Sequence, residues 1–138
     1  MAFLRTVLNG WCTLRRFQSV GKCAFGCTLG KDELEHYLVC RKVWDFGYRW
    51  LALVMPLTQA EAVSQLVGVS LLSDEQNMKL ALLVAAAYRA HNIWRHSGRQ
   101  DGAAFAFLPQ ALREAVREHG GAMRAVDVAW ASERAYEE

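Results

Sequence analysis

The sequence predicts an all-α fold, and three observations support this prediction. Apolar residues make up 53% of the 138 residues, which is enough to build a buried core in a single domain over residues 1–138. Only two prolines occur, and residue types that favour helices, such as Ala, Leu, Arg and Glu, are frequent. Helix-starting motifs, in which a capping side chain is followed three residues later by Glu or Gln, occur at Asp32, Thr58 and Ser73. We therefore expect about six short helices.

The first half of the chain should contain two main helices separated by turns. Apolar residues recur at near-helical spacing over residues 2–18, which predicts an amphipathic helix there. Residues 19–31 contain three glycines and form the densest turn region. Asp32 is expected to cap the second main helix, with Glu35 completing a capping box, and this helix should continue through Trp44 towards residue 53.

The second half should contain the remaining helices. Pro56 is expected to end the preceding helix. The later helices are expected over residues 58–66, 78–94, 109–120 and 122–136. The run LALLVAAAY within 78–94 is apolar on nearly every side, which predicts a central, largely buried helix. The polar stretch HSGRQDG should be a loop, and Pro109 suits the first turn of the helix that follows it.

Cysteine and histidine residues are concentrated in one short stretch, CAFGCTLGKDELEHYLVC. Its spacing is Cys23-x3-Cys27-x8-His36-x3-Cys40. Three thiolates and one imidazole form a common ligand set for structural zinc, which takes four tetrahedral ligands. A helix starting at Asp32 would place His36 and Cys40 one turn apart on one face. We therefore predict a structural Zn²⁺ held in a small zinc-knuckle loop that precedes the second main helix. The alternative is that the cysteines are small buried hydrophobes and His36 is a surface residue.

The residues around this stretch carry a resemblance to a known family. FLRTVLNGWCTLRRFQSVGKCAFGCTLGKDELEHYLVCRKVW resembles the zinc-binding region C-terminal to the polymerase domain of non-LTR retrotransposon reverse transcriptases. The matching features are an amphipathic helix over 3–11, Thr13, the four Cys and His positions, the acidic turn Asp32-Glu33, and Trp44. Residues 74–99 resemble the family weakly, through the helix ending HNIWRHSGR. One departure is that the family often places four residues between His and the last Cys, where this chain has three.

The resemblance implies a detached reverse-transcriptase tail that binds nucleic acid. The chain does not contain the paired aspartates with which a polymerase binds two metal ions, so we predict that it is not an enzyme. No Walker loop, dinucleotide fingerprint or nucleophile elbow occurs. His91, His96 and His119 are interpreted as solvated or capping residues. Cys12 lies outside the zinc pattern and is expected in the core.

Charge is unevenly distributed along the chain. Residues 1–50 carry 8 basic and 4 acidic side chains, a net charge of +4, whereas residues 51–138 carry 8 and 10, a net charge of −2. A basic half is compatible with phosphate binding through counterion release. The predicted contacts to RNA or DNA are Arg15, Arg16, Lys22, Arg41 and Lys42. The alternative is a mildly charged, solvated face.

Aromatic residues alternate with cations just after Cys40. Trp44, Phe46, Tyr48 and Trp50 occur among Arg41, Lys42 and Arg49. Such a stripe could stack bases and contact phosphate. The alternative is a helix over 41–54 that buries Trp44, Leu51 and Val54 and leaves the cations solvated. We also expect Trp44 to pack under the knuckle instead of touching bases.

Two other functions and the location of the protein follow from the same observations. The zinc could hold together a protein-interaction or assembly module, or the chain could be an inactive retroelement remnant. Clustered cysteines without a visible secretory signal predict an intracellular protein, in the nucleus or cytoplasm. An Arg-containing N-terminus whose first acidic residue is Asp32 makes a mitochondrial presequence the alternative. No uncharged apolar run is long enough for a membrane span, so no membrane association is expected. Within the single domain, 1–54 is the zinc-knuckle region and 55–138 the helical region.

Overall fold

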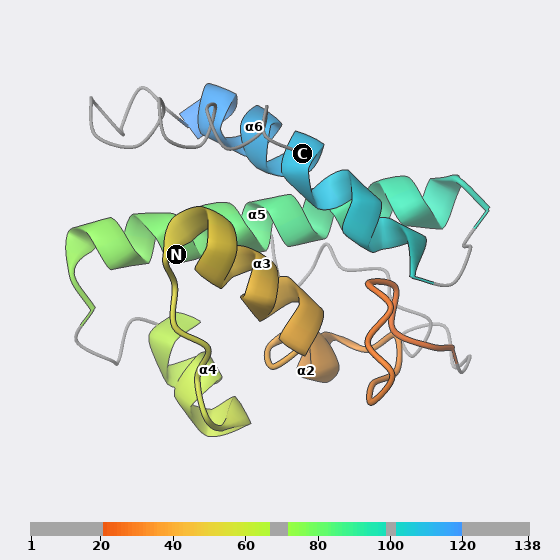
Figure 1. The fold of residues 1–138 in the computed structure, drawn as a ribbon. Coiled ribbons are helices and arrows are strands. Elements are labelled where there is room, and N and C mark those ends of the chain that lie inside the picture. The colour runs from red at the N-terminus through yellow and green to blue at the C-terminus, as the bar shows by residue number, and fades with distance from the viewer. Residues whose placement is uncertain (1–20, 67–71, 99–101, 120–138) are drawn as a thin grey trace.

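The computed structural model of the protein describes residues 21–66, 72–98 and 102–119. These residues are mostly helical and include no strand, which confirms the all-α prediction for the described part (Figure 1). The elements are α2 (Leu34–Tyr37), α3 (Arg41–Leu51), α4 (Gln59–Leu66), α5 (Asp74–His96), the 3-10 helix η2 (Ala103–Phe107) and α6 (Leu108–His119). The helices predicted over 2–18 and 122–136, and Cys12, lie outside the described residues, so the predicted number of about six helices stays a prediction.

The long helix α5 is the centre of the fold. Its start follows the predicted capping box, because the backbone N–H of Gln76 donates to Ser73 Oγ at 3.1 Å and the N–H of Ser73 donates to Gln76 Oε1 at 3.3 Å. In Figure 1, α5 lies between α6 on one side and α3 on the other. Buried side chains therefore occur around more than one face of the helix, as the apolar run LALLVAAAY predicted.

Helix α6 covers one side of α5. Its buried residues follow the helical repeat and are Leu108, Ala111, Leu112, Ala115 and Val116. Pro109 lies in the first turn and the helix ends at His119, just before two glycines, as predicted. Arg89 on α5 forms an ion pair with Glu114 of α6 at 3.5 Å and a second with Glu118. These partly exposed ion pairs contribute little to stability compared with the apolar contacts.

Helix α3 packs on the other side of α5 and comes close to it at a glycine. A Cβ built at Gly47 would lie only 2.7 Å from Cδ2 of Leu83 on α5, so a side chain at this position would force the helices or Leu83 to move. The helix ends at Leu51, because Ala52 adopts a left-handed conformation with φ of 53°. It therefore ends before the predicted position near residue 53, and well before Pro56.

The second main helix predicted from Asp32 to residue 53 is wrong as a continuous element. Helix α2 ends at Tyr37 and α3 begins at Arg41, with Cys40 in an extended conformation as its N-cap. The indole N–H of Trp44 donates to the carbonyl of Leu38 at 2.8 Å and so satisfies a backbone group that the break exposes. Buried Trp44 thus packs beneath the break, in agreement with its predicted structural role.

Helix α4 begins at the predicted Thr58 cap. The N–H of Glu61 donates to Thr58 Oγ1 at 3.1 Å, and a carboxylate oxygen of Glu61 accepts the N–H of Leu57 at 2.8 Å. The return bond of the capping box is therefore shifted by one residue.

No helix in the described part of the chain is long and apolar enough to cross a membrane.

Candidate metal centre

Two of the predicted ligands, Cys23 and Cys27, lie in a loop over residues 21–32 that closes on itself. The N–H of Cys23 donates to the carbonyl of Gly30 at 3.1 Å, and that of Asp32 donates to Gly21 at 2.9 Å. Gly26 turns the loop with a positive φ of 79° and lies against the backbone of Gly102. These contacts place the side chain of Cys23 on the inside of the protein.

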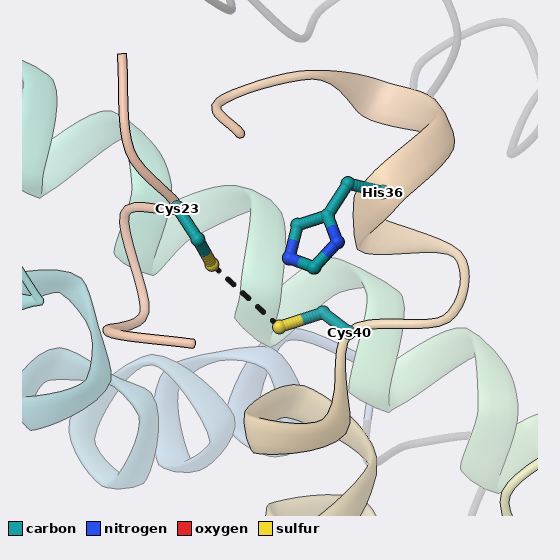
Figure 2. Close-up of side chains that lie close together, drawn as sticks. All are labelled: Cys23, His36 and Cys40. Carbon is teal, nitrogen blue, oxygen red and sulfur yellow. Dashed lines mark hydrogen bonds between the residues drawn. The ribbon is translucent and has the colours of Figure 1, made fainter. Parts of the chain in front are cut away.

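Three of the predicted ligands meet at one point. The ligand atoms of Cys23, His36 and Cys40 all lie within 4.8 Å of one another, and the two sulfur atoms are 3.7 Å apart. Figure 2 shows the three side chains pointing toward one another, from the loop, from α2 and from the residue that precedes α3. Cys23 is 1% exposed and Cys40 is fully buried. This group is close enough to hold a metal ion, and its sulfur and nitrogen donors are compatible with zinc.

Cys27, the fourth predicted ligand, is not part of this close group. Its side chain is partly buried and packs against the hydrophobic core. Its backbone amide nevertheless hydrogen-bonds to the Cys23 sulfur and favours the charged thiolate there. The structure therefore brings together three of the four predicted ligands, with the fourth four residues from Cys23 on the same loop.

The two buried sulfurs lie within hydrogen-bond distance of each other, and either could be the donor. The hydrogen bond from Cys40, and to a smaller extent one from His36, lower the pKa of the Cys23 thiol to about 4 against the opposing effect of burial. The same hydrogen bond, together with burial, raises the pKa of Cys40 far above its usual value. Two thiolates so close together repel each other, and a bound cation would remove this repulsion and deprotonate both.

The position of His36 also fits a ligand. Its Nε2 is buried and has no hydrogen-bond partner among the described residues, which is costly for a polar atom unless something binds it. The imidazole lies directly against Gly30. A Cβ at Gly30 would lie 2.0 to 2.2 Å from three ring atoms of His36, so only glycine leaves room for the ring.

We predict that Gly30→Ala weakens metal binding by roughly 10-fold to 100-fold, as loss of a group that orients a ligand typically does. The added methyl group occupies the space of the His36 ring and must displace it. Competitive zinc titration against a chromophoric chelator measures the change. Gly98→Ala is the control, because no atom lies within 4 Å of its added Cβ; its positive φ of 94°, which Gly30 does not have, makes it the more strained backbone position of the two. Equal zinc affinity for wild type and Gly30→Ala would contradict the role of His36.

A buried polar network lies beside the candidate centre. The hydroxyl of Tyr37 donates to Asp32 Oδ1 at 2.5 Å, and His91 Nε2 of α5 lies 2.8 Å from the same oxygen. The backbone N–H of Ala24 donates to the Tyr37 hydroxyl at 3.1 Å. Burial, followed by the hydrogen bond to Asp32, raises the pKa of Tyr37. This network connects the loop, α2 and α5 through side chains.

Two interpretations from the sequence are corrected by this network. Asp32 does not cap a helix; the N-cap of α2 is Glu33, which makes no side-chain cap bond, and Asp32 is buried as the acceptor in the network. His91 is neither solvated nor capping, since it is fully buried in the middle of a helix. Helical spacing contained the signal, because His91 follows Leu83 and Ala87 at intervals of four on the buried face.

The predicted nucleic-acid contacts are placed in part. Lys22, Arg41 and Lys42 are exposed, and each is next to or two residues from a cysteine of the centre. Arg15 and Arg16 lie outside the described residues.

The aromatic stripe after Cys40 is mainly part of the core. Its buried members are Trp44, Phe46 and Trp50, whereas Tyr48 is exposed. Val54 is exposed, contrary to the alternative in which it was buried.

No family model, curated protein or solved structure matches the chain. The resemblance to the zinc-binding region of reverse transcriptases therefore stays a prediction that depends on the quoted residues. Fold and site together define a class: a mostly helical protein with a buried Cys/His group that is able to hold a metal ion.

Proposed function

We propose that the protein is a non-catalytic structural-zinc module that binds RNA or DNA, similar to a detached reverse-transcriptase tail. The observation that carries the proposal is the convergence of Cys23, His36 and Cys40 on one buried point. Thiolate and imidazole donors favour zinc over the oxygen-seeking cations Mg²⁺ and Ca²⁺. Cys27 is proposed as the fourth ligand, and residues 21–40 would then form the zinc knuckle.

A structural role fits this site better than a catalytic one. Four protein ligands leave zinc no open position for water or substrate. The nearly complete burial of Cys23 and Cys40 also supports this, because a catalytic metal must be reached by its substrate. Zinc would add folding energy to a loop and a four-residue helix, a segment too short to be held by regular secondary structure alone.

The nucleic-acid function is supported by the placement of cations around the centre. Lys22 precedes the first ligand, and Arg41 and Lys42 follow the last one; all three are exposed. Folding of the ligand segment onto zinc would therefore gather these charges, to which the proposal adds Arg15 and Arg16. Such a set binds phosphates mainly by releasing counterions, without reading the base sequence.

A protein-interaction or assembly module is the second candidate, because apolar side chains are exposed near the same elements. Leu29 at the loop and Leu57 before α4 are each about nine-tenths exposed, at 89% and 94%. Such residues could dock a partner protein. This candidate predicts indifference to nucleic acid, which the following measurement tests.

We expect the protein to bind a labelled single-stranded oligonucleotide, as measured by fluorescence anisotropy. The logarithm of Kd should rise linearly with the logarithm of the salt concentration. Replacing Arg41 and Lys42 together by Ala should reduce the slope by about 1.4, since each contact to a single strand contributes about 0.7. The matched control is Arg113→Ala with Arg117→Ala, which removes two exposed cations from α6. Absence of binding at low salt, or binding without a salt slope, would leave the assembly module as the better candidate.

A further inference from the structure

A pocket lies on the side of α3 that faces the start of α6. Its volume is about 260 Å³, and it is bounded by α3, by Phe105 of η2 and by the first turn of α6. None of the metal-centre residues lines it. However, α3 begins directly after Cys40, so the centre and the pocket share one rigid element.

The lining of the pocket combines aromatic surface with charge. Helix α3 contributes the buried rings of Phe46 and Trp50, together with the cations Lys42 and Arg49 and the carboxylate of Asp45. These positions are spaced by three or four residues, which places them on adjacent rows of one helix surface. The pocket therefore has aromatic walls, two positive groups and one hydrogen-bond acceptor.

Phe105 gives the pocket an accessible ring. It is 39% exposed, although phenylalanine is usually buried, and the ammonium of Lys42 lies 5.6 Å from the centre of its ring. This cation–π contact holds the charge of Lys42 over one face of a ring that is itself partly exposed. An anion drawn to Lys42 would thus be next to a ring on which a planar group could stack.

We propose that this pocket takes one unpaired nucleobase, with its phosphate, from single-stranded RNA or DNA. A base matches the aromatic surface through its π face, and its amino or imino groups can donate to Asp45. The attached phosphate matches Lys42 and Arg49. The volume of about 260 Å³ is slightly below the range of about 300–1,000 Å³ found for pockets of drug-sized ligands, which suits a small group such as one base.

The inference rests on the proposed function, since it names the chemical group that the nucleic acid would present. Other polyanions fit the pocket less well. Polyphosphate and the side chains of an acidic peptide have no aromatic face to stack on Phe105. Bases of an intact duplex are stacked and paired, so their faces cannot reach a pocket of this kind.

The test uses the zinc-loaded protein over residues 1–138 and a single-stranded oligonucleotide of about 12 nucleotides, which is within the usual site size of such proteins. Phe105→Ala is expected to weaken binding about tenfold, as removal of one stacking ring does. Tyr48→Ala is the matched control, because Tyr48 is a more exposed aromatic, at 68%, and does not line the pocket. An oligonucleotide with abasic sites in place of the bases should bind equally to wild type and Phe105→Ala.

A second measurement separates the pocket from the rest of the surface. Addition of free nucleoside monophosphate to ¹⁵N-labelled protein should shift the indole N–H resonance of Trp50 and the backbone resonances around Phe105. If these shifts occur but oligonucleotides do not bind, the pocket inference is supported and the proposed function is overturned. If oligonucleotides bind but Phe105→Ala and Tyr48→Ala behave as wild type, the inference is overturned and the proposed function stands. Polyphosphate should displace the oligonucleotide from Phe105→Ala at a lower concentration than from wild type. If the same concentration displaces it from both proteins, the inference is also overturned.

Discussion

Cys40→Ser is expected to abolish zinc binding and to unfold the region around the centre. The Cys40 sulfur lies 3.7 Å from that of Cys23 and is fully buried at the start of α3, so the substitution removes a proposed ligand and alters a buried contact together. Structural zinc supplies roughly 10–16 kcal/mol in small zinc domains, which is comparable to the whole stability of about 5–15 kcal/mol of a typical domain. Metal analysis of protein purified without added zinc should give one zinc per wild-type chain and none for Cys40→Ser.

Circular dichroism and cobalt substitution extend this test. Helicity should fall in Cys40→Ser, and in wild type on addition of a chelator. In Co²⁺-loaded protein, Cys27→Ser should reduce the thiolate-to-metal charge-transfer absorption by about a third if Cys27 is one of three thiolate ligands. An unchanged spectrum would exclude Cys27 from the ligand set. A well-folded wild-type protein without zinc would remove both the site and most of the family argument.

His91→Ala is expected to cost about 3–5 kcal/mol in the free energy of unfolding, because it leaves the buried carboxylate of Asp32 without its partner on α5. The substitution also leaves a cavity next to Trp94, whose ring centre is 5.3 Å from that of His91. Urea unfolding of zinc-loaded protein measures the loss. The network joins the loop and α2 to α5. We therefore expect His91→Ala and removal of the metal to affect the free energy of unfolding non-additively.

Two variants make this second prediction decisive. His96→Ala removes an exposed histidine from the last turn of the same helix and should cost less than about 1 kcal/mol. Asp32→Asn keeps the shape of the acceptor and removes its charge, so this variant should remain folded. If His91→Ala does not fold, the free energy of unfolding of Asp32→Asn can be compared with that of wild type instead. A cost for His91→Ala as small as that for His96→Ala would show that the buried pair contributes nothing to folding.

The candidate centre was predictable in part. Cys23, His36 and Cys40 could be identified because a cluster of ligand-type residues is unusual in a chain of this kind. The route by which they meet was not predictable. One continuous helix from Asp32 was expected to align His36 with Cys40, whereas two helices and a break do so. No proline or glycine marks that break; Trp44 stabilises it by binding the carbonyl of Leu38.

The pocket shows the same division. Sequence spacing identified the cations and aromatics that α3 contributes to the pocket, but not Phe105, which lines the pocket from η2. Phe105 lies 63 positions after Lys42 in the numbering and carries no sequence signal that associates it with α3. Only the packing of α3 and α6 against α5 brings the two together.

By itself, the sequence determined the features that depend on neighbours a few residues apart. The capping box at Ser73, the cap at Thr58, the apolar repeat of α6, the buried run of α5 and the clustering of ligand-type residues all belong to this set. Only the tertiary structure decided that Asp32 leaves its expected cap position to pair with His91, 59 residues away. A buried carboxylate needs a partner more than a helix start needs a cap, because an uncompensated charge in the core costs several kcal/mol and a missing cap about one.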